Sequence, residues 1–342
     1  MTLLVTILVF GVLIFVHELG HFLVAKWADV KVFEFSVGMG PKLFAFTKGE
    51  TNYTLRLLPI GGFVRMAGEQ SGEENPEEVI PEGRSLNNKS IPVRMAVLSA
   101  GSFMNLLLAA VLFVSLFMVI GLPSNENVIG KIIADRPAAT AGLIAGDKIF
   151  AVDGQNVTTW SDLVAYIHKK PLQKINFTVM RNNKKVNFII QTLKDSTNGN
   201  GIVGIEQKWV GQGFVASLKL GFKNAFDVTK AMLVALFMMI VGKLKPEFAG
   251  PVGISKIVGE AVQYGAASVI SFTAIFSINL AILNMLPIPA LDGSRVVLLG
   301  LEALRGKPMD PEKETMIHLI GFALLILLMI FVTYQDIMRV FG

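Results

Sequence analysis

Five residues of the first apolar stretch, His17-Glu18-Leu19-Gly20-His21, combine side chains that can bind a metal ion and accept a proton. His17 and His21 are four positions apart, so a helix stacks them on one face, where both imidazoles can reach the same ion. Glu18 lies one position further round the helix and can reach a water at that ion without being a ligand. The spacing therefore predicts a metal site with a carboxylate base beside it.

The surroundings of this motif add to its meaning. Residues 1–16 contain no charged side chain, and ionisable groups at membrane depth are costly, so those that occur there are candidates for function. The motif follows the H-E-x-x-H pattern of zinc peptidases, which is common by chance in soluble helices but much less expected in an uncharged apolar run. Its position indicates hydrolysis of a peptide bond inside a membrane.

A catalytic zinc site needs three protein ligands and leaves a further position for water. The chain has no cysteine, so the third ligand must be a histidine or a carboxylate. His168 belongs to a soluble segment, and we expect His318, at the start of the last apolar stretch, to be a packed histidine without a partner. Asp292 follows a long apolar stretch that Pro287 and Pro289 interrupt, and irregular backbone at membrane depth is tolerated where it lines a cavity. Asp292 is the preferred third ligand, with a turn or helix cap at the membrane edge as the alternative.

The composition is that of a membrane protein. Hydrophobic residues make up 52% of the 342 residues and charged residues 17%, and the mean hydropathy is +0.57. Four stretches are long and apolar enough to cross a bilayer: about 2–27, 93–121, 268–290 and 315–335. The first lacks a basic start and a cleavage site, so we expect a retained helix and not a signal peptide. The net charge of +5 is explained by basic residues that flank the helices, so no nucleic acid is expected as a partner.

The segments between these helices differ in character. Residues 30–90 begin with alternating stretches, which predict a β-element near the membrane, and their second part, 69–90, is a Glu-rich, turn-rich loop. Residues 124–195 are soluble and strand-rich. Residues 216–262 form an amphipathic membrane-surface segment. The membrane core is thus split into residues 1–121 and 266–342.

The number of spans decides where Asp292 arrives. The apolar part of residues 216–245, Ala231 to Val241, is too short to cross a bilayer. If this segment crossed, the next helix would deliver Asp292 to the face opposite His21. If it lies on the surface, four spans bring Asp292 and His21 to the same depth, with both termini and the soluble domain outside.

Two resemblances follow from these motifs. The pattern Ala-Gly-Leu, Gly-Asp-Lys-Ile, Val-Asp-Gly in residues 141–154 resembles a PDZ domain, which binds extended peptide at a sheet edge; a spacer that excludes bulk is the alternative. The HELGH motif, Gly101-x-x-x-Asn105, the PDZ-like insertion and Asn284-x-x-Pro-x-Pro-x-Leu-Asp-Gly together resemble the site-2 protease family of intramembrane zinc peptidases. The best match is to its bacterial regulator-of-sigma-E protease type, although this chain has room for one PDZ domain instead of two.

The family resemblance implies a role for each motif. It implies a zinc site formed by His17, His21 and Asp292, with Glu18 as catalytic base. It further implies substrate contacts for a set of polar residues: Asn279, Asn284, Tyr53 and Asn105. For the three asparagines, hydrogen bonding between packed helices is the alternative. The implied protein is a polytopic α-helical protein of the bacterial inner membrane, with an extracytoplasmic PDZ domain and the active site toward the cytoplasm. It would cut transmembrane segments of anti-sigma factors or remnant signal peptides.

Three other functions use some of the same residues. A metal transporter or sensor could use the same ligands but needs no base at Glu18. A non-catalytic PDZ scaffold has no use for a complete metal site. An aspartic intramembrane protease needs two facing aspartates, and Asp336 lies at the far end of the last span from Asp292.

Overall fold

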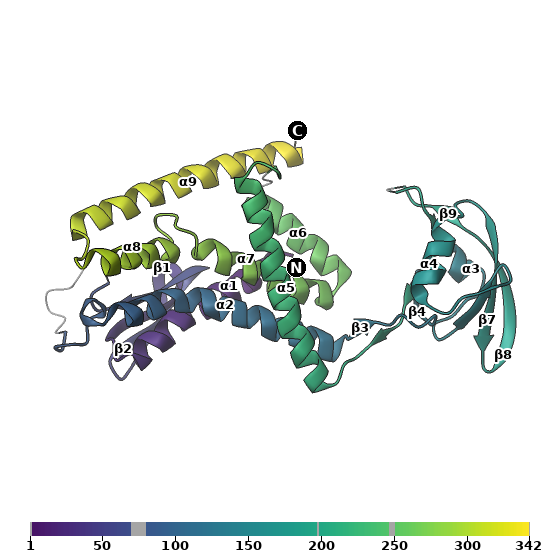
Figure 1. Ribbon diagram of the computed structural model, residues 1–342, viewed down its shortest axis with the longest axis horizontal. Coiled ribbons are helices and arrows are strands. Elements are labelled where there is room, and N and C mark those ends of the chain that lie inside the picture. Colours follow the sequence, from purple (N-terminus) through teal and green to yellow (C-terminus); the bar gives the residue numbers. More distant parts are fainter. Residues whose placement is uncertain (1, 70–79, 197, 246–249, 342) are drawn as a thin grey trace. The chain divides into compact units, whose positions relative to one another are not determined.

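The computed structural model describes residues 2–69, 80–196, 198–245 and 250–341. These residues fall into two compact units, each described here by itself (Figure 1). One unit, the helical unit, combines residues 1–116 with 218–342. The other, the β-rich unit, consists of Phe117–Ser217 and is inserted into the first. Residues 70–79 of the predicted loop at 69–90 lie outside the described residues; the part that is described includes a 3-10 turn, η1 (Leu86–Asn88).

Four helices in the described part of the chain are long and apolar enough to cross a membrane. They are α1 (Thr2–Trp27), α2 (Ile91–Val119), α7 (Ala266–Asn284) and α9 (Pro311–Phe341, apolar over Glu312–Asp336). The predicted fold class, a polytopic helical membrane protein with four spans and a β-rich insertion, is confirmed.

The segment predicted to lie on the membrane surface forms two helices. The first, α5 (Phe214–Ile240), is not among the candidate spans. The second, α6 (Pro251–Tyr264), contacts α1, α7 and α9 within the helical unit. The backbone N–H of Gly253 donates to Asp336 Oδ2 over 2.8 Å, which places a carboxylate at the positive end of α6. The segment predicted as one surface element is thus divided between two helices, and α6 contacts three of the four candidate spans.

The predicted β-element is a hairpin of β1 (Val32–Lys48) and β2 (Thr51–Met66), paired from Val32↔Met66 to Lys48↔Thr51 with several register shifts. The half near α1 is buried with the apolar side chains of Ala25 and Val97. Toward the turn, large apolar side chains such as Phe44 are exposed. One end of the hairpin is thus fixed against the helices while the other presents an apolar surface.

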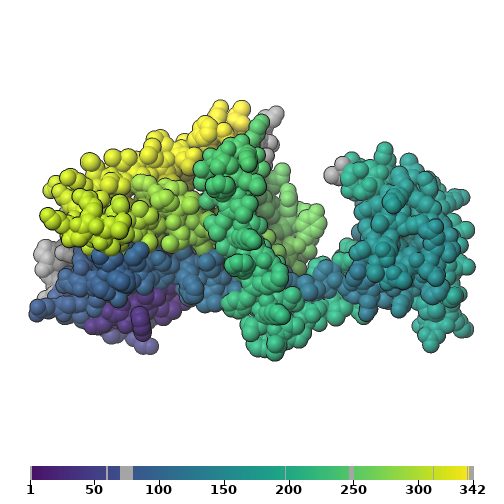
Figure 2. Space-filling view, in the orientation of Figure 1, coloured from purple at the N-terminus to yellow at the C-terminus, as the bar shows by residue number. Residues whose placement is uncertain are grey.

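An additional helix follows the third span. The span was predicted to end at 290, but α7 ends at Asn284, because Pro287 disfavours helical backbone in the residue before it. Asp292 then begins α8 (Asp292–Arg305), a 14-residue helix that the pattern of apolar residues did not indicate. Gly306, at φ +68°, ends it. In Figures 1 and 2, α8 lies between α2 and α9.

The β-rich unit contains the soluble segment. Its elements are β3 (Leu122–Pro123), β4 (Ile129–Ile132), α3 (Pro137–Thr140), β5 (Lys148–Val152), β6 (Gln155–Asn156), α4 (Trp160–His168), β7 (Lys174–Arg181), β8 (Lys184–Gln191), β9 (Leu193–Lys194), β10 (Gly201–Ile202), β11 (Ile205–Gln207) and β12 (Trp209–Val210). The main sheet has the order β6-β5-β7-β8, and a buried core that includes Phe177 and Leu163 joins this sheet to α4.

A buried ion pair also lies in this unit. Asp147 is almost fully buried and ion-paired with Arg181 at 2.6 Å. Burial raises the pKa of Asp147, but hydrogen bonds from Arg181 and the Ile144 N–H lower it by more, so the net shift of the pKa is downward.

Candidate active site

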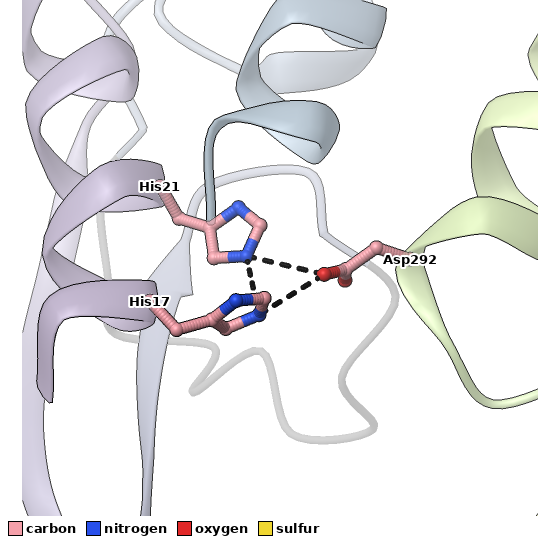
Figure 3. Close-up of side chains that lie close together, drawn as sticks. All are labelled: His17, His21 and Asp292. Atoms are coloured by element: carbon pink, nitrogen blue, oxygen red, sulfur yellow. Dashed lines mark hydrogen bonds and ion pairs between the residues drawn. The ribbon is translucent and has the colours of Figure 1, made fainter. Parts of the chain in front are cut away.

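Three side chains from the two ends of the chain meet at one point (Figure 3). His17 and His21 project from α1, and Asp292 from the first turn of α8. The Nε2 atoms of the two histidines are 3.2 Å apart. Asp292 Oδ2 lies 3.1 Å from His17 Nε2 and 3.3 Å from His21 Nε2. Within the described residues, these three side chains form the one group of histidines and carboxylates whose geometry could hold a metal ion.

The hydrogen bonds of the ligands prepare them for a cation. His21 Nδ1 lies 2.8 Å from the carbonyl oxygen of Val97, an acceptor, so Nδ1 carries the proton and the neutral ring presents the lone pair of Nε2. Asp292 directs Oδ2 toward both Nε2 atoms, within 3.3 Å of each. A carboxylate oxygen and an imidazole lone pair therefore converge on one position.

The size of this triangle fits zinc. Zinc binds histidine nitrogen and carboxylate oxygen at about 2.0–2.1 Å in tetrahedral sites, so two of its ligand atoms lie about 3.3 Å apart. The three atom pairs here are 3.1–3.3 Å apart. His17, His21 and Asp292 thus match one face of a zinc tetrahedron, and the fourth corner is left for water or substrate.

Two glycines allow the helices that carry the site to approach closely. A Cβ atom at Gly20 of α1 would lie 2.4 Å from the carbonyl oxygen of Ala100 in α2. A Cβ atom at Gly101 of α2 would lie 2.4 Å from His21 Nε2 and 2.6 Å from His17 Cε1. In the sequence, Gly101 stood out only as the first residue of the Gly101-x-x-x-Asn105 motif. The structure places it directly against both imidazoles.

Two cavities open on the site, and both are lined by His17, Glu18 and Asp292. The cavity on the β2 side has a volume of about 410 Å³ and is also lined by β2 residues 63–66 and Glu69. The cavity on the α7 side has a volume of about 260 Å³ and is also lined by Asn105, Asn284 and both glycines of Gly61-Gly62. Glu18 lies outside the ligand triangle, which is where a base that acts on water must lie.

The four predicted substrate residues lie in different places. Asn284 lines the α7-side cavity, with Nδ2 3.5 Å from His17 Nε2. Asn105 lines it too and is fully buried, with no partner for either amide atom within the described structure. Asn279 is half-buried in α7, and Tyr53 packs among the rings of Phe22, Phe35 and Phe46. Among the described residues, neither Asn279 nor Tyr53 lines either cavity.

One face of α8 attaches the third ligand to the N-terminal half of the helical unit. Asp292, Arg295, Leu299 and Glu302 recur at helical spacing and share a face. Arg295 pairs with Glu69 at 2.5 Å, and Glu302 pairs with Arg94 of α2 at 2.9 Å. Leu299 between them is buried. These partners were not identified from the sequence, because residues more than 200 positions apart give no local signal of contact.

We expect the Arg94–Glu302 pair to contribute to zinc affinity through this attachment. Arg94→Glu would set two carboxylates against each other and lower both the unfolding temperature and zinc affinity, whereas Arg94→Glu with Glu302→Arg should recover much of both. Groups in contact show coupling energies of about 0.5–3 kcal/mol. A double-mutant cycle on the two properties measures the coupling, and simple additivity would show that the pair does not act as a unit.

Comparison with known proteins identifies the family. The model described as Peptidase family M50 matches residues 5–328. Regulator of sigma-W protease RasP of Bacillus subtilis is 34% identical, with 99% of each chain covered. A putative zinc metalloprotease of Clostridium acetobutylicum is 39% identical over 98% of this chain and 97% of that one. The chain therefore belongs to peptidase family M50. The prediction of a membrane-embedded peptidase of the site-2 protease type is confirmed.

Similarity to a solved structure covers a smaller share of the chain. The PDZ domain of the SdrC-like protein of Listeria innocua is 26% identical, with 24% of this chain and 93% of that domain covered and a TM-score of 0.23.

Proposed function

We propose that this chain is a zinc metalloprotease that cuts membrane-spanning segments of other proteins, with Glu18 as its base. The observation that carries the proposal is the zinc-sized triangle of His17, His21 and Asp292, in which both histidines lie on α1, a helix long and apolar enough to span a bilayer. The names of relatives agree, because zinc metalloprotease RasP of Oceanobacillus iheyensis is 34% identical with 99% of each chain covered.

The chain's residues divide the chemistry between them. Zinc, when bound, supplies a Lewis acid that polarises a carbonyl group and lowers the pKa of water. Glu18, which lines both cavities beside the ligands, accepts a proton from the attacking water and delivers it to the leaving amine. Asn284 and Asn105 offer amide groups to the polar backbone of a peptide in the α7-side cavity.

A helical substrate must unwind before it can be cut, because its amides are held in internal hydrogen bonds. The β2 strand suits an unwound segment, since residues 63–66 line the cavity beside the ligands. Addition of the substrate as a further strand would replace the lost helical hydrogen bonds. This arrangement assigns the capture of substrate to the part of β2 next to the ligands, with Tyr53 acting through the packing of the hairpin.

The β-rich unit is proposed to be a PDZ domain that binds peptide. It has a cavity of about 460 Å³ between one face of α4 and residues 201–207. Val164 and Ile167 of α4 give this cavity apolar walls, as expected of a groove for an extended peptide. A domain that serves only to exclude bulky substrates would not bind peptide at this groove.

We propose the cytoplasmic membrane as the location, with the PDZ domain outside and the active site toward the cytoplasm. Basic residues near the ends of the helices support this orientation by the positive-inside rule. They are Lys26 in the last turn of α1, Lys31, Lys42, Lys48 and Arg56 after it, and Arg305, Lys307 and Lys313 from the end of α8 to the first turn of α9. The relative in Bacillus subtilis is named a regulator of sigma-W protease. An anti-sigma factor or a remnant signal peptide is accordingly the proposed substrate.

Metal removal and replacement test the proposal. The purified protein in detergent should contain about one zinc ion per chain, lose cleavage of a model transmembrane peptide when a chelator removes the metal, and regain it when zinc is added. Asp292→Ala should reduce the zinc content, since it removes one of three ligands. The control is Glu260→Asp, which changes an exposed carboxylate on α6. Cleavage that survives complete metal removal would contradict the proposal.

A further inference from the structure

Helix α9 contacts the loop that carries the third ligand at two neighbouring points. The backbone N–H of Ala290 donates to His318 Nδ1 over 3.1 Å. One turn further along α9, a Cβ atom at Gly321 would lie 2.2 Å from Pro289 Cβ and 2.7 Å from its carbonyl carbon. His318 was expected to lack a partner, but the structure gives it one two residues before Asp292.

The loop is held in a backbone conformation that it would rarely adopt alone. Ala290 has φ +75°, in a region that residues with a side chain seldom occupy and that persists only where the surroundings enforce it. Its N–H group is the one that His318 accepts. The contact with α9 therefore acts on the residue of the loop where the backbone most needs support.

The other side of the loop is held with equal closeness. A Cβ atom at Gly293 would lie 2.3 Å from the carbonyl of Met285, and Ser294 Oγ donates to the carbonyl oxygen of Leu291 over 2.7 Å. Asp292 thus lies in a segment fixed by its own turn on one side and by α9 on the other. Loss of the α9 contacts would leave the turn intact and free only the α9 side.

Among the four candidate spans, α9 is the least buried, with 11% of its apolar window inside the structure. Its contact with the loop is therefore not a result of general burial of the helix. Most of its surface faces outward, as Figure 2 shows for one side. A histidine whose Nδ1 accepts a backbone N–H in such a helix must carry any proton of its neutral ring on Nε2. His318 Nε2 is itself buried and has no hydrogen-bond partner in the described structure.

We infer that His318 and Gly321 are positioning residues for the metal site: they hold Pro289 and Ala290 so that Asp292 reaches the ion that His17 and His21 bind. The inference rests on the proposed zinc site but adds a helix that contributes no ligand. The last span thereby becomes part of the metal centre.

The test measures zinc affinity by competition with a chelator in the full-length protein, together with kcat and KM for a model transmembrane peptide. Removal of residues that orient a ligand typically lowers metal affinity 10- to 100-fold, and we expect a loss in this range for His318→Ala and for Gly321→Ala. Because Gln can accept the Ala290 N–H through its amide oxygen, His318→Gln should recover affinity. In His318→Ala and Gly321→Ala, kcat should fall more than KM rises.

Two controls lie away from the loop. Gly11→Ala places a methyl group on α1 where no described atom lies within 4 Å, and Thr333→Ala removes a hydroxyl of α9 that donates to the carbonyl oxygen of Met329 in its own helix. Both should bind zinc within twofold of the wild type. The electronic spectrum of the cobalt-loaded protein, which responds to ligand geometry, should change in His318→Ala and not in the controls.

The outcomes separate the two proposals. Wild-type protein without zinc affinity would contradict the proposed function itself. Wild-type affinity in His318→Ala and Gly321→Ala, in a wild type that does bind zinc, would overturn the positioning role alone. Equal losses in His318→Ala and His318→Gln would also overturn it, because they would show that the size and shape of the histidine matter and not its acceptor atom.

Discussion

Replacing Gly101 with alanine is expected to lower zinc affinity and the rate of cleavage together, although Gly101 is not a ligand. The added Cβ atom would lie 2.4 Å from His21 Nε2, the atom that faces the metal. Either imidazole would have to leave the triangle, or α2 would have to move away from α1. Helix α2 is held in place, since Val97 accepts from His21 and the Asn105 carbonyl accepts from Ser277 of α7 over 2.7 Å.

The size of the effect follows from this geometry. Forcing an additional methyl group into a close-packed interior costs about 1–3 kcal/mol, and here the strain falls on two of the three ligands. We expect about a 10- to 100-fold loss of zinc affinity, with a smaller change in the unfolding temperature of the metal-free protein. Metal analysis and thermal unfolding measure the two. Gly300→Ala, where the new Cβ meets nothing within 4 Å, is the matched control, and full zinc content in Gly101→Ala would contradict the packing argument.

Glu18→Gln is expected to separate binding from catalysis. The carboxylate lies outside the ligand triangle, so the variant should keep its zinc. The amide cannot accept the proton of the attacking water, and loss of a general base typically lowers the rate about 10²–10⁴-fold. Zinc content and the rate of cleavage of a transmembrane peptide are measured on the same preparation.

The comparison also decides between peptidase and transporter. A transporter or metal sensor that uses His17, His21 and Asp292 has no need of a base, so its metal handling should survive Glu18→Gln. Glu260→Gln removes an exposed carboxylate from α6 and serves as the control for loss of charge. Undiminished cleavage in Glu18→Gln would rule out the proposed role of Glu18.

The parts of the site that the sequence predicted are those written into local spacing. The interval between His17 and His21 determines a shared helix face, and the two prolines before Asp292 mark the end of a membrane helix. The number of apolar stretches then determined which spans could bring these ligands to one depth. Local pattern and span counting were together enough to indicate the ligand triangle.

The parts that were missed depend on contacts across the chain. Helix α8 has a polar face that pairs with Glu69 and Arg94, so its residues do not form an apolar stretch. The role of Gly101 is apparent only when α1 is known to lie against it, and that of His318 only when α9 is known to lie against Ala290. In a sequence, the close approach of two backbones is indicated only by a glycine, and most glycines are present for other reasons.

The ligands come from opposite ends of the chain, two within the first 21 residues and the third at residue 292. During synthesis the first helix is made and inserted long before α8 exists. A nascent chain, or one whose translation stops early, therefore carries the histidines in the membrane without the carboxylate that completes the triangle. The order of the residues thus delays proteolytic capability until α8 has been made.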